Sequence, residues 1–156
     1  MNTSDVIRYV IKNYPYPNEL SKARINKIIY LVDWKSAIQQ DQQITDIQWV
    51  FNHYGPYVDT IETLIRLDDR FYIEEAINPY GSPKHIVTLE TDIDFNEPDG
   101  TTKEILDFII EKTKRFYWDK FIQLVYSTYP IISQEKGSNL DLVVLAKEYK
   151  ELKKNN

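Results

Sequence analysis

The chain has 156 residues, a formal net charge of −5 at pH 7 and no cysteine. This length favours a single domain over residues 1–156, and we expect residues 1–4 and 151–156 to be frayed. The acidic balance argues against a general nucleic-acid or membrane-surface binder, and the missing cysteines exclude disulfides and thiolate metal sites. The N-terminus lacks the features of a signal peptide and no stretch approaches the roughly 18 apolar residues of a membrane helix, so we expect a soluble cytoplasmic protein.

Two helices are predicted at the start of the chain. Apolar residues recur at helical spacing from Ser4 to about Lys12, and the prolines within residues 14–17 end this pattern because proline lacks a backbone donor. A second helix is predicted from Ser21 to Gln39. Its apolar side chains occupy nearly every side, so we expect it to be the central and most buried helix.

A third helix is predicted to begin near Thr45. Thr45 and Gln48 have the spacing of a capping box, and Ile44 and Trp49 have that of a hydrophobic staple. The apolar residues that follow keep a helical spacing as far as Tyr54. The pattern therefore indicates a short aromatic helix.

A Gly-Pro corner follows that predicted helix. Gly55 supplies the left-handed residue after a helix end, and Pro56 prevents continuation. Apolar residues within 58–65 then mark a further amphipathic helix. We therefore expect Gly55 and Pro56 to set the angle between two helices.

The hydrophobic period changes after this point. Residues 71–77 and 84–90 are short, rich in β-branched and aromatic side chains, and separated by a turn-forming loop at 78–83, which predicts a β-hairpin. A solvated connector is expected next, because it carries a run of acids: Glu90, Asp92, Asp94, Glu97 and Asp99.

The C-terminal third reads as helical. Thr101 and Glu104 form a second capping box, a basic interval lies at 112–115, and Ser138 with Asp141 caps the last helix. The fold class we expect is mainly α (α+β), with about six or seven helices, one small β-hairpin and a winged-helix-like N-terminal outline.

Signals for catalysis are scarce. The sequence has no glycine-rich phosphate loop and no recognisable nucleophile motif. Its two histidines, His53 and His85, lie on different predicted elements without carboxylates at ligand spacing, whereas zinc sites need three or four ligands. We therefore expect no enzyme, no metal and no cofactor.

The winged-helix outline makes a transcription regulator one alternative. The candidate recognition helix, residues 57–67, and the residue after it carry three acids and one base: Asp59, Glu62, Asp68 and Arg66. The dense negative charge of a DNA duplex repels such a surface. Nucleic acid is therefore not the expected partner.

Two segments resemble a known family. "RINKIIYLVDW", followed by an aromatic segment ending in "FNHYGPYVDTI", is similar to the SocA-like antitoxin family, also called the Panacea domain. "LVYSTYP" and "LDLVVLAKEY" look like that family's C-terminal helices, so the resemblance covers roughly residues 5–150. The positions that match the family's two patterns are Lys27, Ile28, Ile29, Tyr30, Leu31, Trp49, Phe51, Tyr54, Gly55, Pro56, Tyr57 and Val58.

The resemblance implies a bacterial or phage-encoded antitoxin. Such a protein neutralises a cognate toxin by direct protein–protein contact, and one relative acts as a protease adaptor for its toxin, which implies a protease as an additional partner. A phage-associated adaptor or host-interaction protein is a further alternative. An acidic surface would suit a toxin with a basic channel.

The corner is then expected to be a structural hub and a partner platform. Its aromatic groups are rigid and lose little entropy on binding. We expect Gly55 and Pro56 to form the structural corner, and five residues to converge on one partner-binding patch: Asp33, Trp34, His53, Tyr54 and Tyr57.

Overall fold

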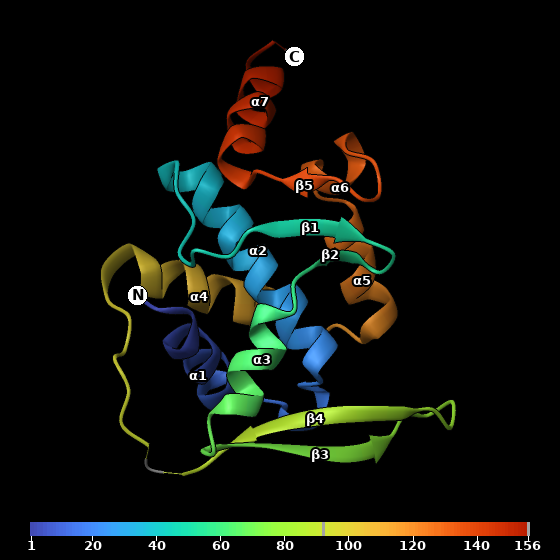
Figure 1. Ribbon diagram of the computed structural model, residues 1–156. Helices are drawn as coiled ribbons and strands as arrows, with labels where there is room; N and C mark the ends of the chain where they lie inside the picture. The colour runs from blue at the N-terminus through green and yellow to red at the C-terminus, as the bar shows by residue number, and fades with distance from the viewer. Residues whose placement is uncertain (92, 156) are drawn as a thin grey trace.

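The fold is organised around α2 (Lys22–Gln40), which runs through the middle of the molecule (Figure 1). The computed structural model describes residues 1–91 and 93–155. Ser21 caps α2, since its hydroxyl accepts a hydrogen bond from the Arg24 amide at 3.1 Å. Thirteen of the 19 residues of α2 are buried, polar ones included. The predicted central helix is confirmed, because a helix that is apolar on nearly every side must be covered on every side.

The other helices pack around α2, with α4 and α7 along its length and α1 between α2 and α3. Helices α1 and α7 extend into the terminal segments that were expected to fray. Besides α2, the described residues form six α-helices and one 3₁₀ helix: α1 (Thr3–Asn13), η1 (Pro17–Glu19), α3 (Thr60–Leu67), α4 (Gly100–Thr113), α5 (Trp118–Tyr126), α6 (Tyr129–Ser133) and α7 (Leu142–Lys154). The fold class is therefore mainly α with a small β component, as predicted.

The starts of two C-terminal helices differ in detail from the prediction. The capping box predicted at Thr101 and Glu104 is wrong, because α4 begins at Gly100 with Asp99 as its N-cap residue, which places Thr101 inside the helix. α7 is capped by Asp141 itself, whose carboxylate accepts a hydrogen bond from the Val144 amide at 3.1 Å. In the acidic connector before α4, Asp92 lies outside the described residues.

The predicted hairpin is present at one end of the molecule. β3 (Phe71–Ile77) and β4 (Pro83–Leu89) pair antiparallel, with Phe71 opposite Leu89 and Ile77 opposite Pro83. The hairpin lies at the N-terminal end of α2, where Val87 donates a backbone hydrogen bond to the Leu20 carbonyl at 2.9 Å. Figure 1 shows it opposite α7.

The helix predicted from Thr45 to Tyr54 is wrong. This segment contains strand β1 (Trp49–Asn52), which pairs antiparallel with β2 (Gly55–Tyr57) on one edge and with β5 (Asn139–Leu140) on the other. The Gly-Pro corner therefore joins two strands, not two helices.

Tertiary hydrogen bonds explain this difference. The capping box predicted that the Thr45 hydroxyl starts a helix. In the structure this hydroxyl donates a hydrogen bond to the Asp33 carboxylate and accepts one from the Ile47 amide at 3.2 Å. Trp49, assigned to the staple, donates its indole N–H to Asp33. Because these groups bond to α2, they no longer cap a helix.

The helix–turn–helix of a winged helix consequently does not form. The element before the corner is a strand, and the candidate recognition helix is reduced to α3, eight residues from Thr60 to Leu67. Among the described residues, no helix is long and apolar enough to cross a membrane.

Candidate partner-binding site

Asp33 is an internal anchor and not a surface residue. Its side chain is fully buried, and its carboxylate accepts five hydrogen bonds. The backbone amides of Ile44 and Thr45 donate at 3.0 and 2.9 Å, and the Trp49 indole Nε1 donates at 2.9 Å. The carboxylate thus fixes the loop that leads into β1.

The ionisation of Asp33 reflects two opposing effects. Burial raises the pKa of Asp33 and outweighs the hydrogen bonds from Thr45, Trp49 and Ile44, which lower it, so the resulting pKa is about 6. At pH 7 the group is therefore mainly a carboxylate, the form that a ring of donors stabilises.

Trp34 is also part of the core. Only 7% of its surface is exposed, and its ring lies 5.7 Å from the ring of Tyr149 on α7. The expected convergence of Asp33 and Trp34 with the corner on one surface patch is therefore wrong. Both lie on α2, whose flanks are covered by α4 and α7.

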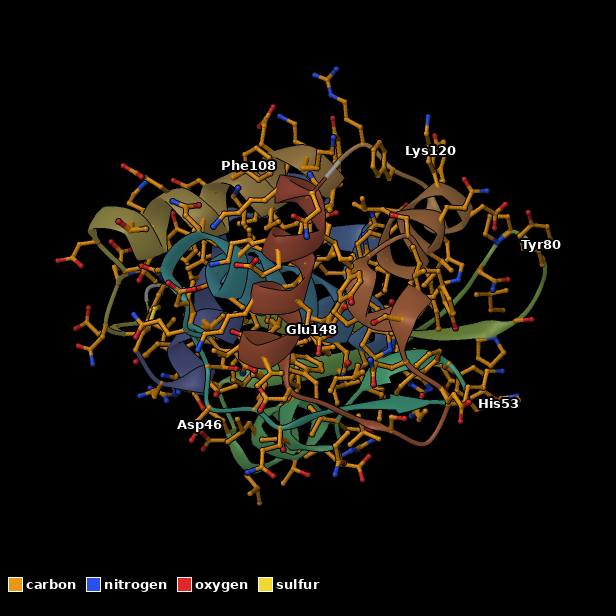
Figure 2. The ribbon with its side chains drawn as sticks, turned by 90° about the horizontal axis from the view of Figure 1, so that it is seen from above. Asp46, His53, Tyr80, Phe108, Lys120 and Glu148 are labelled. Atoms are coloured by element: carbon orange, nitrogen blue, oxygen red, sulfur yellow. The ribbon has the colours of Figure 1, made fainter. Side chains whose placement is uncertain are left out.

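His53 and Tyr54 form the exposed turn between β1 and β2. Tyr54 is 73% exposed, and its ring packs edge-on against the His53 ring with the centroids 5.0 Å apart. The Asn52 carboxamide oxygen accepts a hydrogen bond from the Tyr54 amide at 2.9 Å. Figure 2 shows His53 at the edge of the molecule, pointing away from it.

Gly55 sets the backbone conformation of this turn, and Pro56, which is buried in β2, lies opposite Phe51 of β1. Gly55 is buried with a φ of +96°, a conformation that residues with a side chain rarely adopt. Its α-carbon faces the ring of Tyr126 on α5, which leaves a side chain at position 55 little room. The predicted left-handed glycine is confirmed, although it serves a strand turn.

β1 is fixed on its other edge. The Phe51 amide donates to the Ser138 carbonyl at 2.9 Å, and the Gly137 amide donates to the Phe51 carbonyl at 2.6 Å. Both contacts come from the segment that leads into β5. The His53–Tyr54 turn therefore projects from a hairpin that is anchored on two sides.

Tyr57 lies at the base of the same hairpin, opposite Val50. It is half-buried, and the Lys27 ammonium lies 5.4 Å from its ring centroid. Burial and a hydrogen bond with Asp59 raise the pKa of Tyr57. The structure thus brings His53, Tyr54 and Tyr57 onto one hairpin, with only the first two at its tip.

Lys27 is unusual because it is a lysine of α2 that is only 3% exposed. Desolvation lowers the pKa of Lys27 to about 8. The Tyr57 ring is a favourable neighbour for its charge, since an aromatic face attracts a cation. This contact ties α2 to the base of the hairpin.

Another exposed aromatic, on the β3–β4 turn, was not singled out from the sequence. Tyr80 lies in the β3–β4 turn and is 85% exposed. Figure 1 and Figure 2 show the two hairpin turns projecting toward the same side of the molecule. The signal is the tyrosine in the Asn-Pro-Tyr-Gly-Ser-Pro loop, whose residue types indicate a turn and hence an exposed position.

The two segments that carried the family resemblance meet in space. The Tyr30 ring of α2 lies edge-on to the Trp49 ring of β1, with the centroids 5.6 Å apart, and Asp33 binds the same indole. The family model described as "Antitoxin SocA-like, Panacea domain" matches residues 25–130, more than half of the chain. The chain belongs to the SocA-like antitoxin (Panacea) family.

The match to the Panacea family runs from α2 to the start of α6 and includes the whole β1–β2 hairpin. It is narrower than the stretch of roughly residues 5–150 over which we noted a resemblance. No curated protein and no solved structure matches the chain.

Proposed function

We propose that this Panacea protein is an antitoxin that neutralises a cognate toxin by direct contact, with His53 and Tyr54 at the centre of the contact. Membership of an antitoxin family supports a toxin partner. The single structural observation behind the choice of surface is the exposure of Tyr54, 73%, at the turn of a hairpin that is anchored on two sides. A preorganised aromatic group loses little entropy on binding.

Charge supports the choice of partner. The chain carries a formal charge of −5, so a toxin with a basic surface would be attracted over a distance and would associate faster at low salt. The proposal is for binding and not for catalysis, because the exposed pair lacks a nucleophile arrangement that would make His53 a general base.

Co-expression with the product of the adjacent gene tests the proposal. Wild-type protein should restore growth and co-purify with that product. The Tyr54→Ala variant should lose rescue and bind about 2 kcal/mol more weakly, as truncation of an aromatic hot spot does. Tyr72→Ala is a matched control, since Tyr72 is an exposed tyrosine on β3.

Two results would contradict the proposal. Growth arrest that wild-type protein does not relieve, with no complex formed, would rule out the antitoxin. Equal rescue by Tyr54→Ala and wild type would rule out the hairpin tip as the contact. Relief that instead depends on a cellular protease, with loss of the adjacent gene product, would favour the adaptor alternative.

A further inference from the structure

A groove distinct from the hairpin tip lies between two loops. One wall is the segment Pro15–Glu19 between α1 and α2, and the other is Lys114–Tyr117 between α4 and α5; the groove has a volume of about 520 Å³. This space is within the range of small binding clefts. None of these positions belongs to the β1–β2 hairpin.

A buried arginine links the second wall to the residue that precedes the first wall. Arg24 is 1% exposed, and its guanidinium donates to the backbone carbonyls of Thr113, at 2.9 Å, and Phe116. Its Nε donates to the Tyr14 hydroxyl at 3.0 Å, directly before the first wall. The planar guanidinium thus holds the second wall against Tyr14 at the C-terminal end of α1, directly before the first wall.

The rim of the groove is aromatic. Tyr16 is 47% exposed on one wall, Tyr117 is 80% exposed on the other, and Trp118 beside it is 43% exposed. Pro15 and Pro17 restrict the backbone of the first wall. Stiff walls with exposed rings are typical of grooves that bind extended peptides.

The second wall is locally basic on an acidic protein. Residues 111–120 hold four cations and two carboxylates, and Lys120 lies 5.6 Å from the Phe116 ring centroid (Figure 2 labels Lys120). No carboxylate of the described residues lies within ion-pair distance of Arg115, which is exposed. Lys114 pairs with Glu111 at 2.7 Å, so the positive charge that this wall leaves uncompensated rests on Arg115.

We infer that this groove binds an extended, acidic peptide segment of a protein partner. The tyrosines contact its apolar side chains, and Arg115 and Lys120 pair with its carboxylates. A peptide suits the site better than a nucleic acid, because the net charge of −5 repels a continuous polyanion. Glu19 lies on the first wall, so the carboxylates of the peptide are placed at the second wall.

Three degenerate nine-residue peptide pools test this inference. All carry the same aromatic content, and their variable positions are Asp/Glu, Asn/Gln or Lys/Arg. Fluorescence anisotropy with labelled pools should show the acidic pool binding about tenfold more tightly than the neutral pool, with a preference that weakens at high salt.

Two charge reversals provide the matched comparison. Arg115→Glu should remove the preference for the acidic pool, whereas Lys136→Glu, an equal reversal at an exposed position of the α6–β5 loop, should retain it. Both variants should melt at the wild-type temperature. Equal binding of the acidic and neutral pools, an unchanged preference in Arg115→Glu, or tighter binding of a labelled thymidine oligonucleotide would each overturn the inference.

The outcome is independent of the toxin experiment. The peptide pools contact the groove and not the hairpin tip, so Tyr54→Ala should bind the acidic pool as wild type does. A loss of pool binding in Tyr54→Ala with an intact fold would also overturn the assignment to the groove.

Discussion

The Asp33 carboxylate accepts a hydrogen bond from the Trp49 indole at 2.9 Å, across 16 positions of sequence. Through this bond and four others, the central helix holds the loop before β1. The hairpin tip that we propose to contact the toxin is therefore positioned by a buried charge about twenty residues earlier in the chain.

Removing that carboxylate should destabilise the protein strongly. Asp33→Ala leaves several buried donors unsatisfied, and each costs about 1–3 kcal/mol, so the free energy of unfolding should fall by about 3 kcal/mol or more. Asp46→Asn is the control, because Asp46 is exposed on the same loop and only accepts a 3.4 Å hydrogen bond from Thr3. Urea unfolding measures the free energy of unfolding of both variants. Equal losses in Asp33→Ala and Asp46→Asn would contradict the role of Asp33 as an anchor.

Two glycines with positive φ allow backbone strain and crowding to be separated. Gly55 (φ +96°) faces the Tyr126 ring, with 3.3 Å from an added β-carbon to the nearest ring atom, whereas Gly81 (φ +82°) has open space. In both glycine-to-alanine variants the free energy of unfolding should fall by about 1 kcal/mol or more, because alanine is strained at a positive φ. The free energy of unfolding should fall further in Gly55→Ala, because the added methyl group also crowds the Tyr126 ring.

Equilibrium unfolding of both variants measures this difference. Repeating it in a Tyr126→Ala background should reduce the excess loss at position 55, because the crowding atoms are gone. If Gly55→Ala unfolds at the wild-type midpoint, the turn does not need the conformation described for it.

Trp34 and Tyr54 should respond to truncation in opposite ways. Trp34→Ala removes a core ring and should lower the free energy of unfolding by about 3–5 kcal/mol. Tyr54→Ala removes an exposed ring and should change the free energy of unfolding by less than about 0.5 kcal/mol. Thermal melting of the two variants measures this difference. Comparable losses of stability in both variants would mean that Tyr54 is part of the core as well.

Lys27 should make stability depend on pH in the alkaline range. An unfolded lysine holds its proton to about pH 10.4, whereas the folded one has a pKa of about 8. Between these values the unfolded state binds more protons, so the free energy of unfolding should rise with pH. Below pH 8 both states are protonated and the dependence disappears.

Lys27→Met isolates this effect. The variant should be more stable than wild type at pH 7, and the gap should narrow as the pH rises to 9.5, since wild type then buries a neutral amine. Burial raises the pKa of tyrosines such as Tyr30 in both proteins, so their contribution cancels in the comparison. Parallel pH profiles from urea unfolding would contradict the assignment to Lys27.

The sequence by itself determined the elements whose signals are local. Helix α2 is apolar on nearly every side and has its own cap at Ser21. The β3–β4 hairpin has two β-rich segments joined by a turn-forming loop. The positive φ of Gly55 follows from the residue type at a tight turn. In each case neighbours in sequence supply the deciding interactions.

Only the tertiary structure decided the state of residues 44–57. Thr45 and Trp49 have helix-start spacing, but their donors meet the Asp33 carboxylate, and β1 pairs with Leu140 about ninety residues away. A buried carboxylate with several donors outweighs a local cap worth about 1 kcal/mol. The same distant contacts bury Asp33 and leave Tyr54 exposed, because long-range pairing, and not the order of residues, sets which side chains reach the surface.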